Sequence, residues 1–283
     1  MEYVTEKAPG SFGDREVLLH FFRAGTDPDT PAVLLLHGVH GWASPIEGNK
    51  YGFLARELAA RGISACIAES SRLRRDREAF GDDRTSWAKA AFLGKTFSME
   101  VYDACSAFEY FCRSFSVSSP VLWGFSLGGL LSVLIAGKKT DGYIAGTGLP
   151  SPREGNVAGL IVSGSGDEIR PEASDRLSLP ILDSIGGKSE LLSAASGASP
   201  EFALFFYGSR DESFSEASSR RIFDRLPLPE TRKEFRIIEG ADHSFRKKRG
   251  IPTREPLEEM LLISRAALDR YLRKKGSTGR TEG

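Results

Sequence analysis

The segment from Gly124 to Gly128, with the sequence GFSLG, contains the residues best suited to covalent chemistry. An apolar run over 120–125 leads into it, and an apolar helical pattern over 127–136 follows. A serine on a sharp turn between strand and helix holds its hydroxyl above the sheet, where N–H groups of the helix N-terminus stabilise negative charge. The pentapeptide also occurs by chance in glycine-rich turns, but the strand before it and the helix after it favour catalysis. Ser126 is therefore predicted to be a nucleophile that attacks an acyl carbon.

Such a serine needs a general base, and the chain contains four histidines. His20 lies within an early predicted strand, His37 ends the next one, and His40 belongs to the loop that follows. His243 lies in the sequence GADHSF, in a loop after the last predicted strand. His243 is the candidate base, and a free surface histidine is the alternative interpretation of the same residue.

Two aspartates are similarly suited to orient that imidazole. Asp211 follows the apolar run FALFFY through GSR, and Asp167 follows GLIVS through GSG. Each carboxylate is expected at the C-terminal edge of the sheet. Asp242 adjoins His243 in the sequence, and from there its carboxylate cannot easily turn back to the ring. The residues alone leave Asp211 and Asp167 both open.

Alternating patterns predict the elements that position these side chains. Apolar runs predict strands at 15–23, 31–37, 63–68, 120–125, 157–163, 202–207 and 234–238. Helical periodicity predicts helices over 51–61, 98–115, 127–136, 171–192, 215–226 and 256–275. This alternation is typical of an α/β protein with a mostly parallel, doubly wound sheet and helices on both faces. We expect one domain over residues 1–283, ending in a disordered tail at about 276–283.

A charged segment at 71–97 interrupts the alternation, with seven basic and four acidic residues. It follows a strand at the edge where ligands bind in open α/β sheets, so we expect it to overhang the site. Its aromatic residues could form an apolar wall, and its arginines could meet an anionic group or form a solvated rim. These residues are Trp87, Phe92 and Phe97, and Arg72, Arg74, Arg75 and Arg77.

Four motifs together resemble the α/β-hydrolase superfamily in order and approximate spacing. They are the GFSLGG turn, the loop HGVHG after an earlier strand, the strand end YGSRD, and the late GADHSF. The resemblance covers about 17–272. One departure is that the Asp-x-Arg-Gly-x-Gly stretch of many members is missing after Glu69, where the charged segment begins. The resemblance therefore implies the fold and the catalytic residues of this chain but does not imply its substrate.

The resemblance implies roles for particular residues. The superfamily places its acid after the penultimate strand and its imidazole on the following late loop, which selects Asp211 and His243. One oxyanion donor comes from the residue after the nucleophile, here Leu127. The second comes from the HGVHG loop, in which we choose Val39.

These assignments predict hydrolysis of a carboxylic ester with a modest acyl group, through an acyl-enzyme on Ser126. The segment between the strands at 157–163 and 202–207 is too short for a large helical cap. Neither a phosphate-binding glycine loop nor a metal-ligand cluster occurs in the sequence, so we expect no metal and no cofactor. Further contacts to the substrate are predicted at His40, Trp87, Phe125 and Asp167.

Other functions remain compatible with the same residues. A thioesterase, an acyltransferase or a serine peptidase would use the same three catalytic side chains, because the shape of the pocket decides the leaving group and the acceptor. A non-catalytic binding protein on this fold would commonly lack one of the three, whereas Ser126, His243 and two candidate acids are present.

Composition limits the partners. Lys plus Arg and Asp plus Glu both number 38, so no global field attracts nucleic acid or an anionic membrane. The polar first fifteen residues lack the pattern of a secretory signal, and no run of apolar residues is long enough to span a membrane. Three cysteines give no disulfide framework. We therefore expect a cytoplasmic protein that acts on a small-molecule acyl substrate, with no nucleic-acid partner.

Overall fold

The computed structural model describes residues 2–25, 30–39, 42–171, 179–248, 251 and 253–278, with backbone alone for 271–278. Within them, eight strands form one sheet: β1 (Glu2–Pro9), β2 (Glu16–Arg23), β3 (Ala32–Leu36), β4 (Ala65–Glu69), β5 (Pro120–Phe125), β6 (Gly159–Ser163), β7 (Phe202–Arg210) and β8 (Lys233–Asp242). Their order is β1-β2-β4-β3-β5-β6-β7-β8. β2 is antiparallel to both neighbours, and every other pair is parallel.

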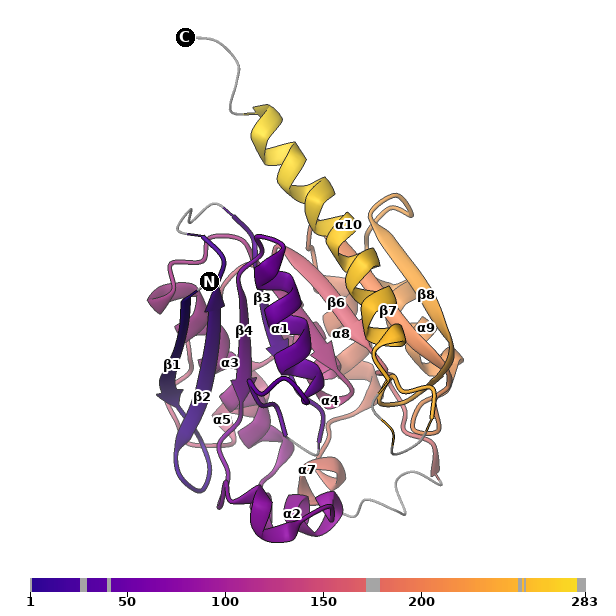
Figure 1. Cartoon of the computed structure of the whole chain (residues 1–283). Helices are drawn as coiled ribbons and strands as arrows, with labels where there is room; N and C mark the ends of the chain where they lie inside the picture. Colours follow the sequence, from indigo (N-terminus) through magenta and orange to yellow (C-terminus); the bar gives the residue numbers. More distant parts are fainter. Residues whose placement is uncertain are drawn as a thin grey trace.

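The helices connect consecutive strands and cover both faces of the sheet (Figure 1). They are α1 (Lys50–Ala60), the 3-10 helix η1 (Arg77–Phe80), α2 (Arg84–Ala91), α3 (Phe97–Ser114), α4 (Leu127–Ala136), α5 (Asp141–Ala145), α7 (Pro180–Asp183), α8 (Lys188–Gly197), α9 (Glu216–Arg225) and α10 (Glu255–Thr278). α1 and α10 lie on one face, and α3, α4, α8 and α9 lie on the other. In the part of the chain that the structure describes, none of these helices is long and apolar enough to cross a membrane.

Strand β5 shows why the central strands are nearly continuous apolar runs. Val121, Trp123 and Phe125 join the core under α1 and α10, and Leu122 joins the core under the opposite helices. A strand that is buried on both faces needs apolar residues at every position rather than at alternate ones. The predicted α/β class, with a doubly wound and mostly parallel sheet, is confirmed.

Three expectations from the sequence need correction. β1 was not predicted, because most of its residues are exposed at the edge of the sheet and it has no apolar pattern. The expected helix over 171–192 is not continuous: α7 ends at Asp183 and α8 begins at Lys188, while 172–178 lie outside the described residues. The tail was expected from 276, but α10 continues to Thr278, and 279–283 lie outside the described residues.

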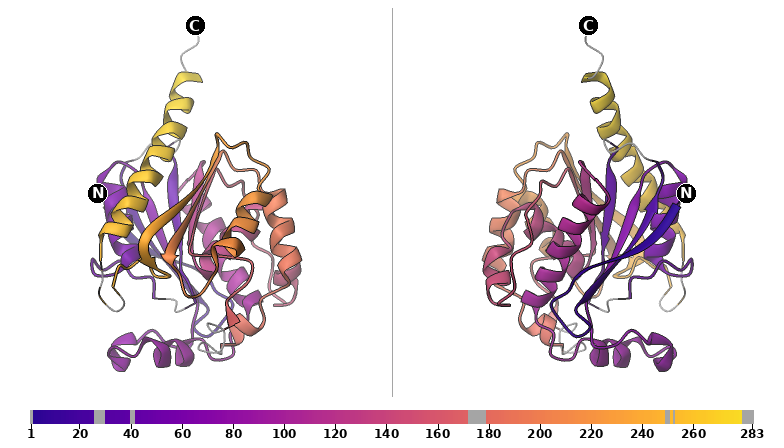
Figure 2. Two further views of the ribbon diagram at one scale, coloured as in Figure 1. Left: turned by 90° about the vertical axis from the view of Figure 1, so that its right-hand side faces the viewer. Right: turned by 90° about the vertical axis from the view of Figure 1, so that its left-hand side faces the viewer.

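The charged segment at 71–97 crosses the edge of the sheet where the parallel strands end. Both views in Figure 2 place α2 beyond that edge, apart from the two helical layers. Trp87, Ala88, Ala91 and Phe92 form a small apolar core of their own, separate from the two cores of the sheet. The segment is therefore a compact unit at this edge of the sheet, and we refer to residues 72–94 as the lid.

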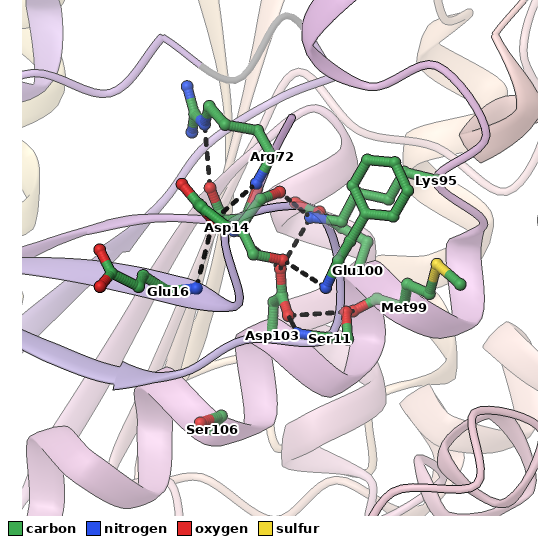
Figure 3. Close-up of polar contacts among 12 residues, drawn as sticks. Ser11, Asp14, Glu16, Arg72, Lys95, Met99, Glu100, Asp103 and Ser106 are labelled. Carbon is green, nitrogen blue, oxygen red and sulfur yellow. Dashed lines mark hydrogen bonds and ion pairs between the residues drawn. The ribbon is translucent and has the colours of Figure 1, made fainter. Parts of the chain in front are cut away.

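Asp103 of α3 fixes both ends of this lid to the body of the protein. Its Oδ2 accepts hydrogen bonds from Ser71 N (2.9 Å) and Lys95 Nζ (2.7 Å), and its Oδ1 accepts one from Ser11 N (2.7 Å). Figure 3 shows Ser11 and Lys95 converging on Asp103, with Glu100 beside Lys95. Burial raises the pKa of Asp103, but Lys95 and the hydrogen bonds outweigh burial, so the pKa is lowered and the carboxylate stays ionised.

We expect Lys95→Met to lower the free energy of unfolding by about 3–5 kcal/mol, because it leaves two buried carboxylates without their cation. Urea unfolding measures this loss. Lys89→Met, on the exposed side of α2, is the matched control and should change stability by no more than about 0.5 kcal/mol. A loss of less than 1 kcal/mol in Lys95→Met would mean that the network does not stabilise the fold.

Candidate active site

Ser126 lies on a strained turn between β5 and α4. Its backbone has φ 53° and ψ −119°, a region that side-chain-bearing residues rarely occupy. The strand and helix cross so closely that a Cβ on Gly124 would lie 2.1 Å from the Gly128 carbonyl oxygen, and one on Gly128 would lie 2.4 Å from that of Leu36. Both glycines of the pentapeptide are therefore required by packing, and the turn holds the Ser126 hydroxyl at the edge of the sheet.

Ser126, His243 and Asp211 form a continuous line of hydrogen bonds. His243 Nε2 lies 3.0 Å from Ser126 Oγ, and His243 Nδ1 lies 2.9 Å from Asp211 Oδ2 and 3.1 Å from Oδ1. The three side chains come from the end of β5, the loop after β7 and the loop after β8. Because parallel strands end at the same edge, residues far apart in the sequence meet there.

The environment of Asp211 favours one tautomer of the imidazole. Burial raises the pKa of Asp211, but His243 and the N–H groups of Phe214 and Ser213 outweigh burial, and the pKa is lowered. An ionised carboxylate can only accept hydrogen bonds, so the proton of the neutral ring lies on Nδ1. The lone pair on Nε2 then faces the Ser126 hydroxyl, which is the arrangement for removing its proton.

Asp167 does not take part in this line of hydrogen bonds. Its carboxylate accepts hydrogen bonds from Arg221 Nε (2.8 Å), Arg221 Nη2 (2.6 Å) and Ser218 Oγ (2.9 Å), all on α9. The structure thus brings Asp211, and not Asp167, to His243. The carboxylate that was predicted to contact the substrate is engaged by an ion pair with Arg221.

The two predicted oxyanion donors lie beside Ser126. Leu127 begins α4, so its N–H has no partner within the helix. Gly38 approaches Ser126 so closely that a Cβ on it would lie 3.0 Å from the serine Cβ. The N–H of Val39 makes no hydrogen bond to any residue that the structure describes. Among the residues that the structure describes, neither N–H has a hydrogen-bond partner, and each belongs to a residue next to Ser126 or next to Gly38.

His37 fixes the direction of the Val39 N–H. Its Nε2 accepts a hydrogen bond from Ser70 N (3.1 Å), so the proton lies on Nδ1, which donates to the Gly38 carbonyl oxygen (2.8 Å). Burial is the main influence on the pKa of His37 and lowers it, which keeps the ring neutral. In a trans peptide the C=O and the next N–H point in opposite directions, so the Val39 N–H points away from His37. The sequence placed His37 only at the end of a predicted strand and did not indicate this role.

The remaining predicted substrate contacts are differently placed. His40 lies outside the described residues. Trp87 and Phe125 are each 1% exposed, so both rings are buried, Trp87 in the small core of the lid and Phe125 in the core under α1 and α10. Phe125 packs against Tyr51 of α1 and against Phe245, two residues after the catalytic candidate histidine.

Most of the lid arginines already have a carboxylate partner within the protein. Arg72 pairs with Glu69 (2.9 Å), Arg75 pairs with Asp14 (2.7 Å), and Arg74 pairs with Asp76. Of the four arginines singled out in the sequence, only Arg77 has no carboxylate partner among the described residues. No group of three or more His, Cys, Asp or Glu residues within the described ranges could hold a metal ion.

The sheet order, the helical layers and the turn at Ser126 define the α/β-hydrolase fold, and comparison with solved structures agrees. Esterase 2 of Thermogutta terrifontis is 17% identical over 97% of this chain and 95% of its own, with a TM-score of 0.62. Est1E from Butyrivibrio proteoclasticus is 13% identical (93% and 96% covered, TM-score 0.57). Esterase B from Lactobacillus Rhamnosis is 15% identical (99% and 89% covered, TM-score 0.64). No protein-family model and no curated protein matches the sequence.

Proposed function

We propose that the protein is a serine hydrolase that cleaves a carboxylic ester through an acyl-enzyme on Ser126. The hydrogen-bonded line from Asp211 through His243 to Ser126 carries this proposal. Ser126 lies on a strained strand-to-helix turn, and its hydroxyl is 3.0 Å from an oriented imidazole. A smaller residue could fill the same place in the fold, so we infer that the hydroxyl has a chemical role.

In the proposed reaction His243 Nε2 removes the Ser126 proton as Oγ attacks the ester carbonyl carbon. The carbonyl π electrons move onto oxygen, which accepts hydrogen bonds from the N–H groups of Val39 and Leu127. Collapse of this intermediate breaks the ester C–O bond, and the imidazolium gives its proton to the departing alkoxide. A water molecule, deprotonated by the same imidazole, then attacks the acyl-enzyme and releases the acid.

The structural neighbours support ester bonds over thioesters and peptides. Structures of the Thermogutta esterase include one phosphorylated by paraoxon and one with propionate bound, and Est1E carries ferulic acid. Propionate is a small carboxylate, which agrees with a modest acyl group. The compact lid agrees with it as well, because a small apolar core at the edge of the sheet encloses less space than a large helical cap.

Labelling with a fluorophosphonate tests the proposal. We expect the probe to modify Ser126 alone, as identified by mass spectrometry of peptides, and a panel of 4-nitrophenyl esters to be cleaved faster than matched thioesters and peptide anilides. Pre-incubation with paraoxon should block the labelling. Ester cleavage without modification of Ser126 would contradict the assignment, and faster cleavage of thioesters or anilides would change the class of substrate.

A further inference from the structure

Four cations gather beside the proposed nucleophile from three separate parts of the chain. Lys50 begins α1, Arg77 and Arg84 belong to the lid, and Arg246 follows His243 by three residues. Lys50 Nζ lies 4.4 Å from the ring centroid of Phe125, the residue before Ser126. Lys50 thus contacts the residue that precedes the nucleophile, and Arg246 lies in the same loop as the proposed base.

The positive charges of these side chains influence one another. Arg77 and Arg84 both lie over the ring of Trp42, at 4.7 and 5.3 Å from its centroid. Burial, together with the charges of Arg246 and Arg84, lowers the pKa of Lys50 to about 7, against an opposing influence of Asp242. Burial and the charges of Arg77 and Arg246 likewise lower the pKa of Arg84. The carbonyl oxygen of Trp42 accepts a hydrogen bond from Nδ2 of Asn49 (2.9 Å), the residue before Lys50, so the two lid arginines on the Trp42 ring lie near the start of α1.

Carboxylates do not balance this charge. In the described part of the chain, no Asp or Glu oxygen lies within 4 Å of the charged nitrogens of Lys50, Arg77 or Arg84. Two acids act on the cluster through space: Asp242, which pairs with Arg246 at 2.9 Å, and Asp82, whose charge opposes the lowering of the Arg84 pKa. The other lid arginines, by contrast, each have a carboxylate partner. Gathering partly buried like charges costs free energy unless an anion completes the site.

We propose that the substrate carries an anionic oxygen group, such as a carboxylate, which binds between Lys50 and Arg84 beside the scissile ester. The inference rests on the proposed esterase function and names its class of substrate. The planar guanidinium of Arg84 can bind two oxygens at once, and Lys50 supplies a compact charge that the Phe125 ring already supports. Arg246 remains paired with Asp242 and adds to the positive electrostatic potential at the proposed anion site.

Two pairs of esters test where the charge lies. The mono-4-nitrophenyl ester of adipic acid is compared with 4-nitrophenyl hexanoate, which places the carboxylate on the acyl chain. In the second pair 3-carboxyphenyl butyrate is compared with phenyl butyrate, which places it on the leaving group. In at least one pair we expect kcat/KM to favour the charged ester by about tenfold, the effect of one charge-assisted hydrogen bond.

Variants identify the residues responsible. Lys50→Met should reduce the charged-to-neutral ratio of kcat/KM by about tenfold, and Arg84→Gln should also reduce it. Arg84 is exposed, so its replacement serves as the second variant if Lys50→Met does not fold. Lys89→Met removes an exposed cation from the same helix and should leave the ratio unchanged. A wild-type ratio near one in both pairs, or a ratio that both variants leave unchanged, would overturn the inference.

Binding separates this inference from the proposed function. Calorimetry measures the affinity of Ser126→Ala protein for each intact ester, and the charged member should bind about tenfold more tightly. Cleavage of neutral esters without any preference for charge would refute only the anion site. Tighter binding of the charged ester without cleavage of any ester would refute only the esterase function.

Discussion

Replacing Ser126 by Ala should lower kcat for ester hydrolysis by about 10⁶, the loss found when the nucleophile of a serine hydrolase is removed. The change deletes one oxygen and leaves the backbone conformation, since alanine and serine are equally strained at φ 53°. Thermal unfolding should therefore match that of the wild type. Stopped assays at high protein concentration, with fluorophosphonate labelling in parallel, measure the loss.

Ser126→Gly is the matched variant for the strain at this position. It should lose as much activity as Ser126→Ala but unfold at a higher temperature, because glycine adopts this conformation without the cost of about 1–3 kcal/mol. Activity above one hundredth of the wild-type value in either variant would mean that another group attacks the ester. A lower unfolding temperature for glycine would mean that the turn is not strained.

Replacing Asp211 by Asn should lower kcat by about 10⁴ with little change in KM. The Asn oxygen can still accept the hydrogen bonds from Ser213 and Phe214, so the local fold is retained. The amide NH2, however, can donate to His243 Nδ1, which moves the ring proton to Nε2 and removes the lone pair that faces Ser126. Steady-state kinetics of the purified variant measures the effect.

Asp167→Asn is the matched control for Asp211→Asn. It weakens the pair between the buried carboxylate of Asp167 and the partly exposed Arg221, which should cost about 1–3 kcal/mol of stability and leave kcat within a factor of two or so. The opposite pattern, an inactive Asp167→Asn beside an active Asp211→Asn, would assign the acid to the loop after β6. Equal partial losses would imply that neither carboxylate alone orients the imidazole.

The sequence predicted those parts of the site that depend on local pattern. The strand Pro120–Phe125, the helix Leu127–Ala136 and the turn between them agree with the structure to the residue, because buried strands and glycine-bounded turns leave strong local signals. The choice between Asp211 and Asp167 had no such signal. It depends on Ser218 and Arg221 of α9, which engage Asp167 and leave Asp211 to the imidazole.

The sequence left two interpretations of the lid arginines open, an anion site and a solvated rim. The partner of Arg75 is Asp14, 61 residues earlier, and no local pattern reveals such a pair. The sequence did not single out Lys50 at all. This residue occupies the first position of an ordinary amphipathic helix, and only the fold brings Phe125, Arg84 and Arg246 near it.

The attachment of the lid to Asp103 bears on how such a protein can change over evolution or by engineering. Since Ser71 and Lys95 meet at one carboxylate oxygen, the two ends of the intervening chain lie side by side. Its length can then vary at small cost, because each doubling of a loop adds only about 0.6 kcal/mol of closure free energy. Ser126, Asp211 and His243 all lie outside it. We expect that the lid can be exchanged as a unit, with Ser71 and Lys95 as its junctions, while the three candidate catalytic residues stay unchanged.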